Sequence, residues 1–490
     1  MDFLSHDVRR PPPATCEIHG RPQTKAEEIY VHFSKLTMAA SSRRAAVAEA
    51  SISGGADKFC DAHARQPGRQ FCALGLRPIK RGAAPGVHGQ LFGSATGVRF
   101  VNRRQVFVGA GALGAGALGA AGYGAWQFVE MERYVAVAES IRSPLADRPE
   151  LKELIRLATL AANGHNTQPW RFHVIEGRIE IRPDFARRTP VVDPDDHHLF
   201  ASLGCAAENL VIAAAARGRQ GVLSFAPAGG SLVFEFNEGP PAVSPLFEAI
   251  TRRQSTRAEF DGRSAPSADL AALADAARIP GVELILITER PRIDDILALV
   301  VAGNSAQMAD AAFMRELESW LRFNPRQALE TGDGLFSAAS GNPTAPAWLG
   351  GLLFDWAFRA GPENDKYARH LRSSAGVAVF VSAENDRDHW ARSGRASQRF
   401  ALQATALGLK HAFVNQPVEV PAVRRQLAAY LGVGARRPDL VMRFGYGPEM
   451  PKSLRRPVEQ VLARGDDQAS CLGPSIVAGL TILSKSAAST

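Results

Sequence analysis

From about residue 150 onward, hydrophobic positions recur at helical and then at strand-like spacing. Residues 151–158 carry apolar side chains three and four positions apart and predict a helix that ends at Asn163-Gly164. Apolar and polar residues alternate over 171–175 and 178–182 on both sides of Glu176-Gly177, which predicts a β-hairpin. The predicted helix and hairpin therefore border a polar loop.

The same patterns predict the remaining elements of the body. Helices are expected over 199–216, 246–253, 268–277, 293–321, 392–407 and 422–431. Strands are expected over 222–225, 232–236, 282–288, 377–382, 412–414 and 440–444. Residues 324–350 are rich in Gly, Pro, Asn and Ser, and a loop of that length inside a domain predicts a lid or a disordered insert. Residues 465–490 are expected to form a flexible tail.

Two Ala-rich helical segments resemble each other. The segment Gly204–Gly218 can be aligned with Gly394–Gly408, with five of fifteen positions identical. The repeat favours an internal duplication. We therefore expect two related halves, 139–243 and 244–464.

The charge of the chain lies in its first part. The net charge is +8, and residues 1–105 hold 16 Lys and Arg against 8 Asp and Glu. Since this surplus equals the whole net charge, the body is neutral and no nucleic-acid partner is expected. Five Cys without a C-x-x-C pair exclude a disulfide scaffold and a zinc ribbon. Residues 1–101 show no periodic pattern and predict a disordered leader, or an annotated start that lies upstream of the true one.

Residues 102–138 are similar to an export signal. Arg103-Arg104 precedes 24 uncharged residues, 106–129, of which seven are Gly. This pattern is typical of the twin-arginine translocation (Tat) pathway, and Ala136-Val137-Ala138 offers a cleavage site. The alternative is an uncleaved anchor formed by 106–129. We expect translation to start near residue 100 and export to the periplasm or cell envelope, with a cytoplasmic protein as the alternative.

Two loops carry polar groups that suit ligand binding. His165, Asn166 and Gln168 stand in the sequence HNTQPW, where amides offer donors and acceptors to the edge of a planar heterocycle. Arg253, Ser255 and Arg257 stand in RRQSTR, where two guanidinium groups and a hydroxyl could hold a phosphate. The alternatives are a turn satisfied by its own backbone and a solvated basic turn.

A third basic segment follows the last strand. Lys452, Arg455 and Arg456 stand in PKSLRRP and would add cations to the phosphate site, unless they form a surface tail. Asp195-Asp196-His197-His198 is interpreted as a solvated helix start, so no metal site is predicted. Cys205 is expected to be a buried small residue. No Ser-His-Asp pattern appears in the sequence, and no catalytic side chain is assigned.

Together these motifs resemble the nitroreductase family of FMN flavoproteins. HNTQPWRF, RRQSTRAEF, the helix end Ala406-Leu407-Gly408-Leu409 and PKSLRRP carry the resemblance, which covers about residues 140–464. The chain looks closest to the tandem, Acg-like FMN-binding branch. Asp184, Arg187 and Asp193-Pro194 before SLGCAAENL fit that branch as well.

The resemblance implies a fold and a cofactor. The fold would be α+β, with two nitroreductase-like halves forming a pseudo-dimer inside one chain. Arg253, Ser255 and Arg257 would hold FMN by its phosphate and ribityl chain, with help from Lys452 and from Arg455 or Arg456. Asn166 would bind the polar edge of the flavin, with His165 and Gln168 nearby. Asn415-Gln416 stands where relatives have Glu-Gly near flavin N5, which is a departure from the family pattern.

Each motif occurs once, so we expect one FMN per chain, between the halves. As an enzyme, the chain would pass two electrons through flavin N5 from NAD(P)H, a quinol or a protein donor to a nitro compound, quinone or similar acceptor. The alternative is an FMN-storing protein whose lid covers the flavin. With the pseudo-dimer built in, the chain would be a monomer or a homodimer.

Overall fold

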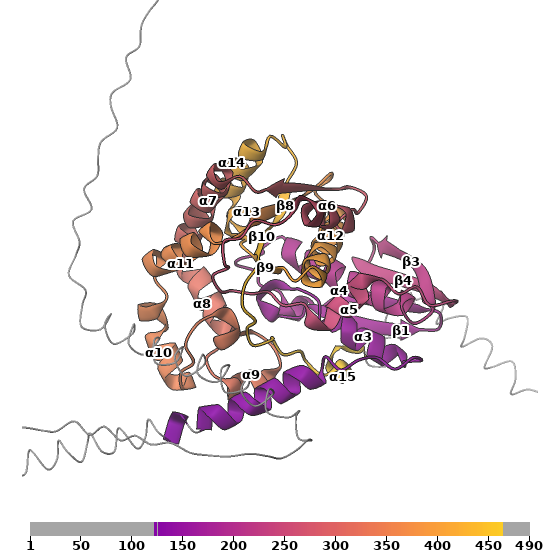
Figure 1. The fold of residues 1–490 in the computed structure, drawn as a ribbon. Coiled ribbons are helices and arrows are strands. Elements are labelled where there is room, and N and C mark those ends of the chain that lie inside the picture. The colour runs from indigo at the N-terminus through magenta and orange to yellow at the C-terminus, as the bar shows by residue number, and fades with distance from the viewer. Residues whose placement is uncertain (1–121, 125, 464–490) are drawn as a thin grey trace, which may run out of the picture. The chain divides into compact units, whose positions relative to one another are not determined.

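The computed structural model describes residues 122–124 and 126–463, and its frame is two antiparallel four-stranded sheets (Figure 1). The first sheet has the order β1-β2-β4-β3 and contains β1 (Trp170–Ile175), β2 (Arg178–Pro183), β3 (Arg219–Ala226) and β4 (Ser231–Glu238). The second has the order β5-β8-β10-β9 and contains β5 (Val282–Ile287), β8 (Gly376–Ser382), β9 (Lys410–Phe413) and β10 (Pro438–Gly445). The predicted mixture of helix and sheet is confirmed.

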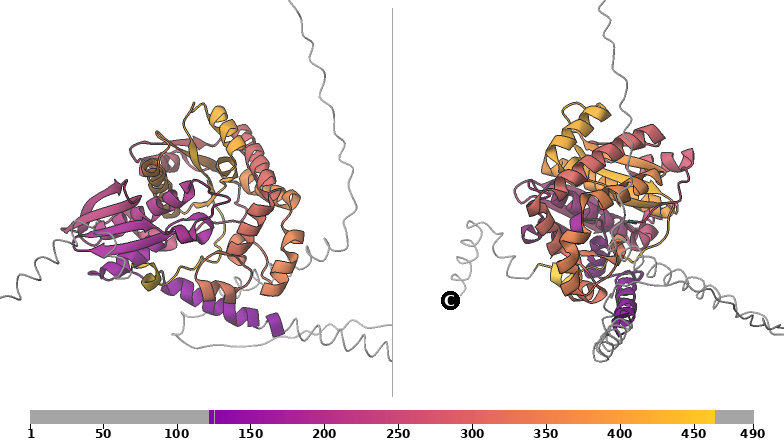
Figure 2. Two further views of the ribbon diagram at one scale, coloured as in Figure 1. Left: turned by 180° about the vertical axis from the view of Figure 1, so that it is seen from behind. Right: turned by 90° about the vertical axis from the view of Figure 1, so that its left-hand side faces the viewer.

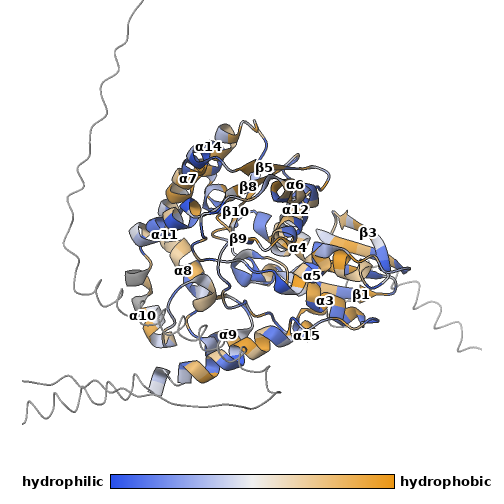
Figure 3. Cartoon of the chain, viewed as in Figure 1, coloured by the Kyte–Doolittle hydropathy of each residue, from blue (hydrophilic) through white to orange (hydrophobic). Residues whose placement is uncertain are grey.

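Helices surround and separate the sheets. The first half contributes α3 (Leu151–Thr159) and α4 (His197–Ala215). The second half contributes α5 (Pro245–Arg252), α6 (Ser267–Ala276), α7 (Arg290–Met308), α8 (Ala311–Trp320), α9 (Pro325–Thr331), α10 (Ala347–Ala357), α11 (Ala360–Arg372), α12 (Arg387–Ala406), α13 (Gln416–Glu419), α14 (Pro421–Leu431) and α15 (Val458–Val461). Figure 3 shows hydrophobic residues gathered around β1 and β3, whereas α11 is mainly hydrophilic.

The two repeat helices cross in the centre of the molecule, between the sheets (Figure 1). A Cβ added at Gly204 of α4 would lie 1.9 Å from the carbonyl oxygen of Ala391. A Cβ added at Gly394 of α12 would lie 1.9 Å from the carbonyl oxygen of Ala201. Each glycine thus meets the residue three positions before the other glycine. The contact is reciprocal and uses the register in which the sequence repeat aligns.

Two predictions about the second half are wrong. The expected helix over 293–321 is broken into α7 and α8, which meet at an angle of 93°. The carboxylate of Asp310 accepts hydrogen bonds from the N–H groups of Ala312, at 2.7 Å, and Phe313, at 3.4 Å, and so starts a new helix. The insert 324–350 is no plain loop, because it contains α9, a short strand β7 (Leu335–Phe336) and the start of α10.

The described N-terminal segment packs against the body. Residues 126–140 form a helix that runs along the side of the molecule that carries α9 (Figure 2). Tyr134 is fully buried, its ring centroid lies 4.5 Å from that of Phe336, and its hydroxyl donates to the carbonyl of Lys452 at 2.8 Å. The predicted boundary between signal and body therefore falls inside a packed helix. The predicted leader 1–101 and tail 465–490 lie outside the described residues.

The described residues belong to one compact unit, which holds both predicted halves. Among the described helices, α4 alone is long and apolar enough by itself to span a membrane, and the pair α7 and α8 passes the same test together. Most of α4 is buried between the first sheet and α12, as is usual for the central helix of a core.

Candidate functional site

A cavity of about 240 Å³ lies where the loop after α3 meets α4, α7, α11 and β9. Four of the residues predicted to bind the cofactor line it, namely His165, Arg257, Asn415 and Gln416. Polar groups from elsewhere in the chain also line it, and these include Asn304, Gln307, Ser340, Lys366, Tyr367 and Glu419. The cavity is therefore built from both halves of the chain.

The HNTQPW loop is held in an unusual backbone conformation. His165, Asn166 and Gln168 all have positive φ, at 47°, 55° and 54°. Side chains other than glycine adopt this region at a cost of about 1–3 kcal/mol each, and such strain gathers at functional sites. Burial, with the nearby charge of Arg257, lowers the pKa of His165 to about 4. At neutral pH the His165 ring is therefore uncharged where it faces the cavity.

Arg257 contributes a positive charge to the cavity wall. It is mostly buried, and burial lowers its pKa. Within residues 122–463, no carboxylate lies within ion-pair distance of its guanidinium group. An uncompensated cation at a cavity favours an anionic or electron-rich ligand.

Three more arginines gather behind this cavity, and none of them forms an ion pair with a carboxylate of the described residues. Arg142, Arg253 and Arg455 are 8%, 6% and 7% exposed. Burial lowers the pKa of Arg142 and of Arg253 to about 10 and that of Arg455 more strongly, and the charges of neighbouring arginines add to the effect for Arg253 and Arg455. In the part of the chain that the structure describes, none of the three forms an ion pair with Asp or Glu.

Their hydrogen-bond partners are almost all carbonyl groups. Arg253 donates to the carbonyl of Leu160 at 2.7 Å, and its Nε and Nη1 are buried without a hydrogen-bond partner among the described residues. Arg455 donates to the carbonyls of Thr159, Leu160 and Ala161. Residues 162–164, which follow directly, line the cavity. We call Arg142, Arg253 and Arg455 the arginine cluster. Of the three, Arg253 retains free N–H groups for an anion, whereas Arg455 donates all of its N–H groups to acceptors within the chain.

The amides of Asn166 and Gln168 are engaged in internal contacts. Asn166 donates to the carbonyls of Gly334, at 3.1 Å, and Leu454, and accepts from Arg455 at 2.9 Å. Gln168 donates to the carbonyl of Gly332 at 2.9 Å and accepts from the N–H of Arg456 at 2.9 Å. Neither lines the cavity. Both amides hold the insert and the C-terminal segment in place, and their predicted contact with flavin remains a prediction.

The other predicted cofactor residues lie apart from the cavity. Ser255 forms a bridge with His411 of β9, and Lys452 forms an ion pair with Glu139 at 3.4 Å. Arg456 is buried and donates to the carbonyl of Gln168 at 2.7 Å. None of these three residues lines the cavity, and their roles stay predictions.

Sequence patterns gave no sign of two charged residues at the site. Glu419 lines the cavity, and burial raises its pKa to about 7 against the effect of a hydrogen bond from Gln307. Asp333, in the insert, pairs with Arg187 of the first half and with Arg322 at 2.7 Å. Neither carboxylate belongs to a recognisable motif, so the tertiary structure was needed to find them.

The start of α4 corrects one prediction and confirms another. His197 is fully buried and bonds to Asp439 at 2.9 Å, so this helix start is not solvated as expected. The bond to Asp439, which lies far away in the sequence on β10, holds the His197 ring in the interior. Cys205 is 3% exposed, as predicted, and burial raises its pKa to about 12.

No protein-family model matches the chain. The chain is 28% identical over 330 residues to a Mycobacterium tuberculosis protein provisionally named NAD(P)H nitroreductase Rv3131, covering 64% of this chain and 92% of that one. It is 25% identical over 334 residues to the M. tuberculosis protein provisionally named NAD(P)H nitroreductase acg. This match covers 64% of this chain and 94% of that one.

Solved structures were compared as well. The Bacteroides fragilis nitroreductase with bound FMN has a TM-score of 0.27 at 16% identity, over 42% of this chain and 90% of that one. The FMN-dependent nitroreductase NfnB of Mycobacterium smegmatis, solved with NADPH, has a TM-score of 0.27 at 15% identity, over 41% and 87%.

Proposed function

We propose that the chain is an FMN-binding oxidoreductase of the nitroreductase kind, which transfers two electrons from NAD(P)H or another donor to a nitro compound, quinone or similar acceptor. The names of the two M. tuberculosis relatives support an oxidoreductase. The observation that carries the proposal is the arginine cluster, because buried guanidinium groups without carboxylates need an anion.

The described residues fit FMN at its phosphate end. The free Nε and Nη1 of Arg253 are charge-assisted donors, and each bond of that type to a phosphate is worth about 1.5–3 kcal/mol. Arg142 and Arg455 add positive charge and form no ion pair with Asp or Glu of the described residues. We therefore assign the phosphate to this cluster, with Arg253 as its main donor and Arg455 as the matching cation of the C-terminal segment.

The cavity fits the ring end of the same cofactor. Arg257 places a cation at the wall, and Gln416 has a buried Oε1 without a hydrogen-bond partner among the described residues. The side chain of Asn415 accepts from the N–H of Val441 at 2.9 Å, which fixes the turn that presents Gln416. FMN, when bound, supplies the chemistry of accepting and passing on two electrons. The chain orients it and excludes water.

We also propose one FMN per chain. The sequence repeat aligns Ala201, Ser202 and Cys205, which line the first cavity, with residues Ala391, Arg392 and Arg395, which line a second cavity of about 360 Å³. The first cavity is bordered by β9 and the second by β3, and each of these is an edge strand of its sheet. This correspondence supports two related halves arranged as a pseudo-dimer.

The second cavity is poorly suited to a phosphate. Arg392 is paired with Asp388 at 2.6 Å and Arg395 with Glu208 at 2.8 Å. Both cations that line it are therefore already neutralised, whereas Arg257 and the arginine cluster are not. This contrast supports a single flavin site.

The phosphate assignment is tested by comparing FMN with riboflavin, which lacks the phosphate. Binding to the purified full chain is followed by quenching of flavin fluorescence. We expect FMN to bind at least a hundredfold more tightly than riboflavin, and Arg253→Gln to reduce that preference at least tenfold. Arg252→Gln is the matched control, because Arg252 is exposed and precedes Arg253 in the same motif. Equal affinities for FMN and riboflavin in the unchanged chain would refute the assignment.

The insert favours a second candidate function, storage of FMN. Leu335, Ser340 and Asn342 of the insert line the cavity, and the turn at 332–334 is held by Asn166, Gln168 and Arg187. A lid fixed this firmly would keep substrates from the flavin. Anaerobic addition of NADPH separates the two candidates. Bleaching of the flavin spectrum by NADPH supports the enzyme, whereas bleaching by dithionite alone supports storage or a different donor.

Export through the Tat pathway is proposed from the sequence of residues 102–138 alone. An exported protein would need a donor other than cytoplasmic NAD(P)H, such as a quinol or a protein. Sequencing the N-terminus of the protein from its native cell fraction tests this proposal. Peptides from residues 1–90 would refute the expected start near residue 100.

A further inference from the structure

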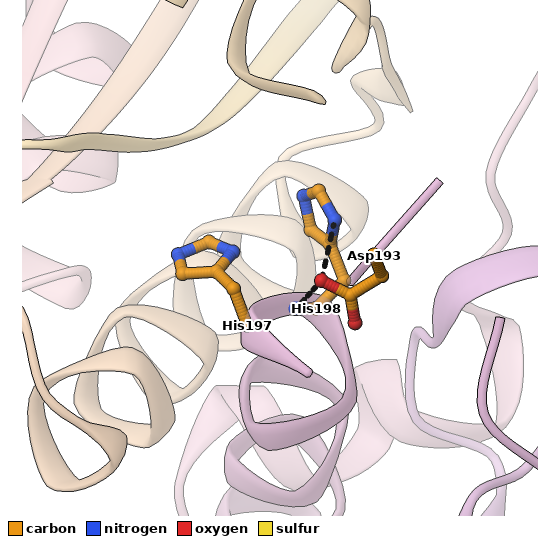
Figure 4. A group of neighbouring side chains, drawn as sticks. All are labelled: Asp193, His197 and His198. Carbon is orange, nitrogen blue, oxygen red and sulfur yellow. Dashed lines mark hydrogen bonds and ion pairs between the residues drawn. The ribbon is translucent and has the colours of Figure 1, made fainter. Parts of the chain in front are cut away.

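Two histidines and an aspartate meet where α4 begins (Figure 4). Asp193, His197 and His198 can each offer one ligand atom, and these atoms lie within 4.8 Å of one another. We propose that these three residues bind a divalent transition-metal ion, with Zn²⁺ as the best match. The proposed metal site uses no residue of the arginine cluster, although His198 also lines the cavity that we assign to the flavin ring.

His197 supplies the strongest argument. Its ring is fully buried, and its Nε2 bonds to Asp439 Oδ1 at 2.9 Å. Its Nδ1 is buried with no hydrogen-bond partner among the described residues, whereas buried polar atoms are normally satisfied. A carboxylate on one ring nitrogen, with the other nitrogen free, is the usual arrangement of a metal-binding histidine. Asp439 therefore orients His197 as a ligand.

Asp439 is itself held in position. Its other oxygen accepts a hydrogen bond from the N–H of Ser382 at 2.7 Å, and its side chain is fully buried. This contact ties the carboxylate to the neighbouring strand β8. The ring of His197 therefore has little freedom to turn its Nδ1 toward another partner.

His198 and Asp193 complete the group. Nδ1 of His198 lies 3.7 Å from Asp193 Oδ1, and its ring stands nearly perpendicular to that of His197, with centroids 4.9 Å apart. The carboxylate of Asp193 accepts the N–H groups of His198 and Leu199, both at 2.9 Å. These bonds fix the carboxylate beside the first turn of the helix. Figure 4 shows the ring of His198 between the other two side chains.

The donor set determines the class of metal. Two imidazoles and one carboxylate are typical of zinc sites that keep an open position and of related transition-metal sites. Zn–N bonds of about 2.0–2.1 Å require the ligand atoms to approach closer than 4.8 Å, so the side chains must close on the ion. His198, Thr189 and Val192 also line the main cavity. The metal would therefore lie at the cavity wall.

The cation of Arg437 does not oppose the site strongly. Its charge acts on the His198 ring. However, the guanidinium group of Arg437 is paired with the carboxylate of Asp195, which compensates that charge.

The test titrates the purified, metal-free full chain with Zn²⁺ by calorimetry and with Co²⁺ by absorbance, with and without FMN. We expect one equivalent of metal per chain in both conditions. His198→Asn should weaken binding at least a hundredfold, and Asp439→Asn about 10–100-fold. The matched control is His389→Asn, because His389 also contacts an aspartate, Asp386 at 3.0 Å, but lies outside the group. It should leave the affinity unchanged.

Circular dichroism checks that each variant is folded. If Asp439→Asn unfolds the chain, His198→Asn still decides, because His198 is partly exposed and its replacement leaves the bond between His197 and Asp439 in place. X-ray absorption of the zinc-loaded chain should also count two imidazole ligands. The proposal is overturned if the chain binds no metal, if His198→Asn binds as tightly as the unchanged chain, or if no imidazole ligand is seen.

Discussion

Arg187 of the first half and Asp333 of the insert form an ion pair that joins segments far apart in the chain. A second cation, Arg322, bonds to the other oxygen of Asp333 at 2.7 Å. The carboxylate is nearly buried, with 9% of its side chain exposed. The insert that lines the cavity is therefore fastened by a carboxylate held between two guanidinium groups.

Replacing this carboxylate should loosen the insert. Asp333→Asn leaves two arginines without their partner, so we expect the free energy of unfolding to fall by about 3 kcal/mol and bound FMN to dissociate faster. Urea unfolding and stopped-flow fluorescence measure the two effects. Asp261→Asn removes a similar but exposed pair with Arg263 and should cost less than about 1 kcal/mol. Equal effects of the two substitutions would contradict the fastening role.

The same carboxylate should make the fold sensitive to acid. Burial alone would raise the pKa of Asp333, but hydrogen bonds from Arg322 and Arg187 outweigh burial and leave it lowered. The stability that it contributes is therefore present above the unfolded value of about 3.9 and is lost as the pH falls through the lower folded value. When the pH is lowered from 5 to 3, the free energy of unfolding of the Asp333→Asn variant should consequently fall by less than that of the unchanged chain.

The crossing of α4 and α12 should not tolerate a methyl group. Gly204→Ala and Gly394→Ala each place Cβ 1.9 Å from a carbonyl oxygen, so each should lower the free energy of unfolding by at least about 3 kcal/mol. Both substitutions push the same two helices apart, and the double variant should lose less than the sum. Urea unfolding measures all three variants.

Gly361→Ala is the control for these two substitutions. Gly361 lies in α11 with no atom within 4 Å of an added Cβ, and this change should be neutral or stabilise by up to about 1 kcal/mol. Small, additive effects of Gly204→Ala and Gly394→Ala would show that the crossing is not tight.

Glu419 should make the ligand-free fold less stable as the pH rises. Burial raises its pKa to about 7, against about 4.3 in the unfolded chain, so the folded state holds the proton more tightly. The stabilisation is full below about pH 4.3 and is lost as the pH rises to about 7. Glu419→Gln removes this dependence, so its stability relative to the unchanged chain should increase between pH 5 and pH 7 and level off above. A difference in stability between Glu419→Gln and the unchanged chain that stays constant with pH would contradict this role of Glu419.

Elements set by local sequence could be predicted, and those set by distant contacts could not. The hairpin around Glu176-Gly177 follows from alternation and a glycine with positive φ at the turn, both local properties. No Gly or Pro marks the break between α7 and α8 in the sequence. The break depends instead on the side chain of Asp310, which caps the start of α8. The burial of His197 depends on Asp439, which lies 242 residues away.

The same limit applies to the site. HNTQPW and RRQSTR were recognisable, and both segments do adjoin the cavity through His165 and Arg257. Which side chains face the cavity was not predictable, since Asn166 and Gln168 turn to the insert instead. Arg142 lies in no motif and joins the arginine cluster only because residues 126–140 pack against the body.

We propose that one FMN binds at the arginine cluster and its adjoining cavity. The amount of flavin released from the purified, FMN-reconstituted full chain, counted against protein, tests this proposal. We expect one FMN per chain, and loss of most of it in Arg253→Gln but not in Arg252→Gln. No bound flavin, or two FMN per chain, would overturn the proposal.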